Sequence, residues 1–294
     1  MRNLFLYLTT VLIWGSTWFV ITFQLTKVDP VLSVAYRFAL ASLILFLFCI
    51  VTRRNMKFKP VDHGFMALQG LFSFSIGYWF VYLAELRLAS GLVAVITSSL
   101  IFMNIFNGWM FGQSRINRFV FFGALVGMVG ILLVFRPEIS SFSRSRENTV
   151  AMVLAITSTL IYSFGNIIVV RNQNRNLPVM PTNAFSMGYG AVVMFLVALL
   201  SGKPLQFDFS FQYMASLAYL AVFGSVVAFY CYFSLIGNIG ADKAAYGPVV
   251  IPAIALAVSA IFEGYRWSTH SLSGVALLIL GNLFILSKKT KVIT

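Results

Sequence analysis

The residues that could carry chemistry in this sequence are polar groups placed inside long apolar runs. Arg37 stands about two helical turns after Pro30 and is the charge set deepest in such a run. A buried arginine pairs with a carboxylate or with helix-end carbonyls for structure, or it attracts an anionic group of a substrate. The sequence leaves both roles open.

Aromatic residues with a polar edge form a second candidate set. Trp14 and Trp18 lie one turn apart on a helix, as do Tyr78 and Tyr82. Near the end of an apolar run such residues are typical of a membrane interface, which fits Tyr82. Near the middle of a run, the indole or phenol needs a partner that a cavity can supply. The candidates for a cavity are therefore Trp14, Trp18, Tyr78 and Tyr162.

A stripe of small and polar residues runs along 91–111, from Ala94 through Ser98 to Asn104. The stripe predicts either close packing against another helix or, through Asn104, a hydrogen bond to a bound solute. The run 243–262 instead carries Pro248 and Pro252, which break backbone hydrogen bonds and predict a kinked helix. A freed carbonyl that contacts substrate is the less favoured interpretation of these prolines.

Patterns typical of enzymes are missing from the chain. His63 and His270 lie far apart in loops, and no glycine-rich phosphate loop, metal-spaced Cys/His group or nucleophile motif occurs. We therefore expect a protein that is not an enzyme and that needs no cofactor or metal.

The composition places these residues in a membrane. Of 294 residues, 60% are hydrophobic and 10% are charged, whereas a soluble domain is about one quarter charged. Apolar runs of about 20 residues, enough to cross a bilayer, recur from end to end. They predict an all-α polytopic membrane protein with ten transmembrane helices, near 4–24, 31–51, 64–84, 91–111, 119–135, 149–170, 183–200, 211–233, 243–262 and 272–286.

The net charge of +13 fits membrane orientation better than nucleic-acid binding. With ten spans, 13 lysines and arginines fall on the side of the N-terminus and 7 on the other side. Because basic loops stay in the cytoplasm, both termini are expected there. No basic face outside the membrane is left for nucleic acid.

The two halves of the chain repeat each other. Because each half has five spans, the second half must enter the membrane from the opposite side, which is the inverted repeat of alternating-access carriers. We expect repeats at 1–140 and 149–294, joined by an extracytoplasmic linker at 141–148. A shift of 151 residues superposes Phe111 on Phe262, Arg115 on Arg266, Gly123 on Gly274, and Gly130 on Gly281.

The acidic residues bear on energy coupling. All eight lie in loops or at the ends of apolar runs, with Glu85, Asp242 and Glu263 nearest the membrane. Carriers that couple to protons often use a buried carboxylate. This distribution therefore favours passive, gradient-driven transport or weak coupling.

The chain resembles the drug/metabolite transporter superfamily in its EamA-type branch, over nearly its whole length. It departs at Gln113, where the family often has glutamate. The matching motifs are LIWGST at 12–17, Pro30 with AYRF at 35–38, Ala94 through FG at 111–112 with Gly123 and Gly130, and Pro248 through FEG at 262–264 with Gly274 and Gly281.

This resemblance implies two inverted halves around a central cavity, lined by spans 3, 4, 8 and 9 together with spans 1 and 6. Members of the superfamily move amino acids, metabolites or drugs out of the cytoplasm, and some import them. The cavity positions implied here are Trp14, Trp18, Tyr78, Tyr82, Ser98, Asn104, Tyr162, Asn166, Tyr230 and Tyr246.

We therefore expect an alternating-access carrier in the lipid bilayer of a bacterial inner membrane, monomeric or weakly dimeric, that exports amino acids or related small molecules. Uptake of a vitamin or nucleobase and the flipping of a lipid-linked substrate are alternatives on the same fold. A non-transporting membrane assembly factor is the remaining class.

Overall fold

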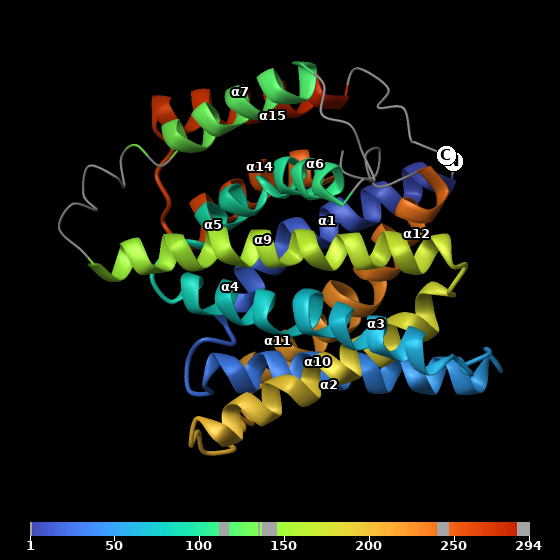
Figure 1. Cartoon of the computed structure of the whole chain (residues 1–294). Coiled ribbons are helices and arrows are strands. Elements are labelled where there is room, and N and C mark those ends of the chain that lie inside the picture. Colours follow the sequence, from blue (N-terminus) through green and yellow to red (C-terminus); the bar gives the residue numbers. More distant parts are fainter. Residues whose placement is uncertain (1, 112–117, 135, 137–145, 240–246, 287–294) are drawn as a thin grey trace.

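The computed structural model describes residues 2–111, 118–134, 136, 146–239 and 247–286 (Figure 1). Within these ranges the chain is helical and contains no strand. Seven helical segments are long and apolar enough to cross a membrane: α1 (Arg2–Thr22), α2 (Pro30–Val51), α3 to α4 (Pro60–Glu85), α5 to α6 (Ser90–Met110), α9 (Arg146–Asn174), α10 (Val179–Leu200) and α11 to α12 (Phe211–Ile239).

Three shorter apolar helices complete the set in the described residues: α7 (Arg118–Val134), α14 (Gly247–Phe262) and α15 (Thr269–Leu286). Each of the ten predicted spans therefore overlaps a helix, which confirms the all-α polytopic fold. Large apolar side chains such as Leu12, Leu47 and Leu200 are exposed on the outside of the bundle. In a bilayer these side chains face lipid instead of water.

Two of the spans are interrupted by π-helical segments at corresponding places. The third span consists of α3 (Pro60–Leu71), η1 (Phe72–Ile76) and α4 (Gly77–Glu85). The eighth consists of α11 (Phe211–Tyr219), η2 (Leu220–Val227) and α12 (Ala228–Ile239). In η2, Ser225 Oγ donates to the Leu220 carbonyl at 2.9 Å. Such segments frequently mark functional sites, and the sequence did not reveal either of them.

The packing of α7 on α15 shows how the halves are related (Figure 1). A Cβ on Gly130 would lie 2.6 Å from the Gly274 carbonyl oxygen, and one on Gly281 would lie 2.6 Å from that of Gly123. The shift of 151 residues relates Gly123 to Gly274 and Gly130 to Gly281. Exchanging each glycine for its repeat partner turns the contact of Gly130 with Gly274 into the contact of Gly281 with Gly123. A two-fold relation between the halves requires this correspondence.

The same exchange relates other helix contacts. The second span, α2, packs on η2 of the eighth span, while the seventh span, α10, packs on η1 of the third. The second and seventh spans also pack on each other, side by side in Figure 1. This pattern supports two inverted five-helix halves, and the exact limits of 1–140 and 149–294 stay a prediction.

Ion pairs between loops and helix ends join the two halves at both ends of the bundle. Most involve an exposed lysine or arginine, and pairs of that kind contribute little to stability. The backbone N–H of Ser210, at 2.9 Å from Asp208 Oδ1, lowers the pKa of that carboxyl. The pairs are Lys27–Asp208 at 3.9 Å, Lys203–Asp29 at 2.8 Å, Arg87–Glu147 at 2.9 Å and Arg171–Asp62 at 2.9 Å.

The glycine contact between α7 and α15 predicts a position-specific effect on stability. A Cβ at Gly274 would lie 2.6 Å from the Gly130 oxygen and 2.7 Å from the Val134 nitrogen, so neither backbone can yield without separating the helices. We expect Gly274→Ala to lower the free energy of unfolding by about 1–3 kcal/mol. Gly64→Ala is the control, because a Cβ there meets nothing within 4 Å. Equal thermal unfolding curves for both variants in detergent would contradict this packing.

A candidate substrate cavity between the two halves

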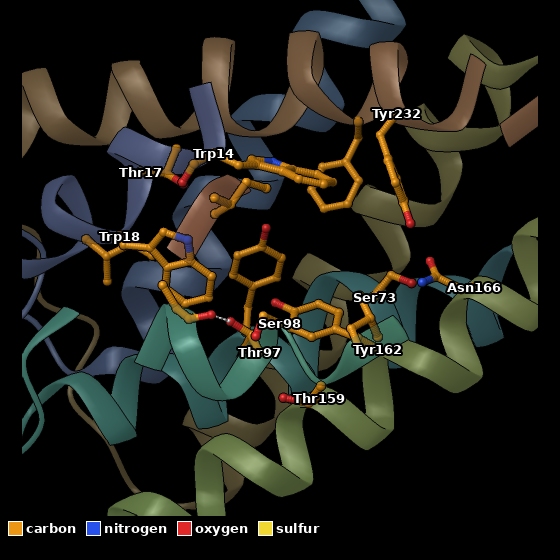
Figure 2. Close-up of a pocket in the computed structure, with 16 residues that line it drawn as sticks. Trp14, Thr17, Trp18, Ser73, Thr97, Ser98, Thr159, Tyr162, Asn166 and Tyr232 are labelled. Atoms are coloured by element: carbon orange, nitrogen blue, oxygen red, sulfur yellow. Dashed lines mark hydrogen bonds between the residues drawn. The ribbon is translucent and has the colours of Figure 1, made fainter. Parts of the chain in front are cut away.

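A cavity lies in the middle of the bundle, between helices of both halves (Figure 2). It encloses about 810 Å³ of space free of atoms, its opening included. The lining residues are Trp14, Thr17, Trp18, Ile21, Ser73, Tyr78, Ala94, Thr97, Ser98, Leu100, Thr159, Tyr162, Asn166, Phe229, Tyr232 and Ile251.

The cavity lining is aromatic and uncharged. Trp14 packs against Phe229 and Tyr232, with ring centroids 5.1 and 5.0 Å away, and Tyr78 packs against Tyr162 at 5.3 Å. Among the described residues, none that lines the cavity is Asp, Glu, Lys, Arg or His. A charged solute would therefore lose hydration here without meeting an opposite charge in direct contact.

The hydroxyl groups of the cavity point their hydrogens at their own helices. Thr17 donates to the Trp14 carbonyl at 3.0 Å, Thr97 to that of Val93 at 2.9 Å, and Ser98 to that of Val95 at 2.6 Å. A hydroxyl oxygen that donates in this way still has lone pairs to accept a hydrogen bond. These groups therefore present acceptors to a solute.

Trp18 presents the complementary group. Its indole Nε1 is buried and has no hydrogen-bond partner among the described residues, although the side chain lines the cavity (Figure 2). The indole of Trp14 differs, because its Nε1 donates to the Gly224 carbonyl in η2 at 3.2 Å. An unpaired buried N–H is unfavourable, and an acceptor on a bound solute would satisfy it.

Arg37 lies behind the cavity lining, fully buried, and does not reach the cavity. Its guanidinium carbon stands 4.5 Å from the centroid of the Tyr78 ring. Its Nε donates to Ser225 Oγ at 3.0 Å and its Nη1 to the Tyr82 hydroxyl at 3.4 Å. Within the described residues it forms no ion pair, and hydroxyls and an aromatic face take the place of the carboxylate or helix-end carbonyls that a structural role predicted. Arg37 thereby ties α2 to α4 and to η2.

The structure brings six of the predicted site residues into one lining. The six are Trp14, Trp18, Tyr78, Ser98, Tyr162 and Asn166, which come from α1, α4, the junction between α5 and α6, and α9. At Ser98 the fourth span is interrupted, because α5 (Ser90–Thr97) ends just before it and α6 (Leu100–Met110) begins two residues later. Contact of these residues with a substrate stays a prediction.

The other predicted residues lie elsewhere. Tyr82 is fully buried behind the cavity lining. Asn104 contacts the lining through Asn166, because the Asn166 Nδ2 donates to the Asn104 Oδ1 at 3.3 Å. Tyr230 is half-buried outside the lining, next to Phe229. Pro248 and Pro252 fall in α14, with Pro252 in its interior, and Tyr246 is outside the described residues.

Several lining residues were missed by sequence reasoning. Thr17 follows Trp14 by three residues and Thr159 precedes Tyr162 by three, so helical periodicity could have found both. Ser73 lies in η1, where the helical period changes, and no sequence signal marks it. The contact of Tyr232 with Trp14 joins the eighth span to the first and is likewise invisible in the sequence.

An all-α membrane chain of two inverted halves around an uncharged central cavity has the architecture of a secondary carrier. Comparison with known proteins gives the family: residues 1–136 and 149–287 match the EamA-like transporter family. The chain belongs to this family and is a membrane transporter.

Named relatives extend over nearly the whole chain. The inner membrane transporter YedA of Escherichia coli (strain K12) is 27% identical over 92% of this chain and 84% of its own length. PecM of Dickeya dadantii is 25% identical over 95% of this chain and 92% of its own length. PagO of Salmonella typhimurium is 22% identical over 94% of this chain and 90% of its own length. One solved crystal structure superposes with a TM-score of 0.71 at 15% identity over 96% of each chain, which shows a shared fold.

The hydroxyl of Tyr82 offers a test of the Arg37 cluster. Tyr82→Phe removes the acceptor of Arg37 Nη1, and leaving a buried charged donor unpaired costs about 1–3 kcal/mol or more. We expect this variant to unfold at a lower temperature than the parent in detergent. Tyr230→Phe is the control, since Tyr230 is half-buried and lies outside this cluster. An unchanged Tyr82→Phe unfolding curve would contradict the role given to Arg37.

Proposed function

We propose that this transporter carries a small, net-neutral metabolite with an apolar body, and that it exports amino acids or related compounds from the cytoplasm by alternating access. The observation that carries the proposal is the cavity itself, which is aromatic, uncharged and placed between the inverted halves. In this view the protein acts in the bilayer of an inner membrane, with both termini in the cytoplasm, as a monomer or weak homodimer.

The polar groups of the cavity suit a zwitterion. The free Trp18 N–H can donate to a carboxylate, and the oxygens of Thr17, Thr97 and Ser98 can accept from an ammonium group. The rings of Trp14, Tyr78 and Tyr162 supply a surface for an apolar side chain. A solute with two opposite charges would satisfy both kinds of group while adding no net charge to the site.

One turn before Ala94, which lines the cavity, α5 is joined to the last turns of α14, and in this proposal the contact closes one end of the cavity. The Ser90 and Ser259 hydroxyls lie 3.1 Å apart, and the Gly91 N–H donates to Ser259 Oγ at 2.9 Å. With the N-terminus in the cytoplasm, this closure is on the outer side. Release to the outside would require α5 and α14 to separate there, while the cytoplasmic ends of the eighth and ninth spans close.

Transport by this route predicts that the Trp18 indole contributes to affinity. Trp18→Phe keeps an aromatic ring and removes the free N–H, and a hydrogen bond to a charged acceptor is worth about 1.5–3 kcal/mol. We expect the half-saturation concentration for the transported amino acid to rise roughly 10- to 150-fold. The measurement is counterflow of labelled aromatic and aliphatic amino acids in proteoliposomes.

Trp79→Phe is the matched control, because the Trp79 indole N–H is also buried without a partner among the described residues but lies outside the cavity lining. Equal affinities for both variants would remove Trp18 from the site. Flux only of vitamins or nucleobases, or only of lipid-linked compounds, would replace amino-acid export by one of those activities on the same fold. Vesicles sorted by orientation decide between export and uptake.

A further inference from the structure

A buried carboxylate without any hydrogen bond lies at the closed end of the cavity. Glu85, the last residue of α4, is 7% exposed, and neither of its carboxylate oxygens has a partner among the described residues. Its burial was not expected from its place at the end of an apolar run. A carboxylate in this position is unfavourable while it is ionised.

A second carboxylate lies within electrostatic range of Glu85 and holds the closure together. Glu263 follows α14 directly, and its Oε2 accepts from Ser90 Oγ at 2.7 Å and also from Ser259 Oγ. These serines are the residues that join α5 to α14. Glu85 leads into the turn before α5, so the two acids lie on the two sides of the closure.

No cation forms an ion pair with Glu85 among the described residues. Arg37 of α2 is the cation that acts on Glu85, and it has no ion pair within 4.0 Å in this part of the chain. Tyr82 stands one turn earlier on α4, and α5 carries no charged residue. Arg87, two residues after Glu85, is exposed and paired with Glu147 of α9 at 2.9 Å. Glu85 is therefore buried with neither an ion pair nor a hydrogen bond among the described residues to offset the loss of hydration.

The geometry points to a proton-binding site: Glu85 binds one proton when α5 and α14 close this end of the cavity, and releases it when the end opens. The proton converts the buried carboxylate to a carboxylic acid, which carries no charge. Opening admits water, which solvates the carboxylate and removes the advantage of the proton. Glu263, part-exposed at the same closure, accepts hydrogen bonds from the serines that must separate on opening.

Proton binding of this kind would link the carrier to pH. When one state holds one proton more than another, their ratio changes by up to about tenfold per pH unit. The closed end is therefore favoured at low pH and the open end at high pH. The proton-binding site does not depend on the identity of the transported compound. It would give the carrier a means of coupling to protons, which the distribution of acidic residues in the sequence did not suggest.

The closure can be measured without knowing the substrate. Spin labels on Leu86→Cys and Ile261→Cys, both exposed beside the closure, report the distance between the α4–α5 turn and the end of α14. The two native cysteines, Cys49 and Cys231, are buried and would be replaced by serine. The protein in lipid nanodiscs is studied by pulsed electron resonance from about pH 5 to about pH 9.

We expect a short-distance population at low pH and a longer one that grows with pH, by up to about tenfold per unit in the population ratio. Glu85→Gln should keep the short distance throughout, because glutamine is neutral at every pH. Glu147→Gln is the matched control on the same end of the bundle and should retain the pH dependence of the parent.

Two results would overturn the proposal. One is a parent distance distribution that is unchanged across the pH range. The other is a pH dependence that survives in Glu85→Gln. Thermal unfolding of each variant shows whether it is folded. The first outcome is read from the distance distributions of the parent and of Glu147→Gln, so it can be decided even where another variant fails to fold. Neither outcome depends on which solute is carried.

Discussion

A guanidinium buried inside a membrane protein constrains everything around it. Arg37 is fully buried, and the described residues offer it hydroxyls and aromatic faces instead of an ion pair. To satisfy it, α2, α4 and η2 must come together, which places the Tyr78 ring between the charge and the cavity. Among the described residues the cavity lining is uncharged, because the Arg37 guanidinium is held one layer behind it.

The helix packing follows the inverted repeat, whereas the buried charged residues do not. The glycine contacts of α7 with α15 and the crossed packing of α2 and α10 on the π-helical segments follow a two-fold relation. Arg37 and Glu85 do not, since the shift of 151 residues places them on Gly188 and Ile236. Arg37 and Glu85 are therefore features of the first half alone, whereas Glu263 comes from the second half.

Much of this could be predicted from the sequence. Ten apolar runs gave the spans, and the positions of Trp14, Trp18, Tyr78 and Tyr162 near the middle of their runs placed them in one lining. Tyr82 was predicted to lie at a membrane interface because it stands near the end of its apolar run. Packing against other helices instead buries it completely. The π-helical segments and the burial of Glu85 depend on which helices cover them, and hydropathy along one chain holds no information on that.

The central claim is that a transported solute occupies the cavity between the halves. It is tested most directly by placing a cysteine at Ser98, which lines the cavity, in protein whose native cysteines are replaced, and by measuring its rate of labelling in the same vesicles that are assayed for amino-acid flux. The account predicts that a transported compound slows labelling in proportion to its occupancy. A compound that is transported and leaves the labelling rate of this cysteine unchanged would contradict it.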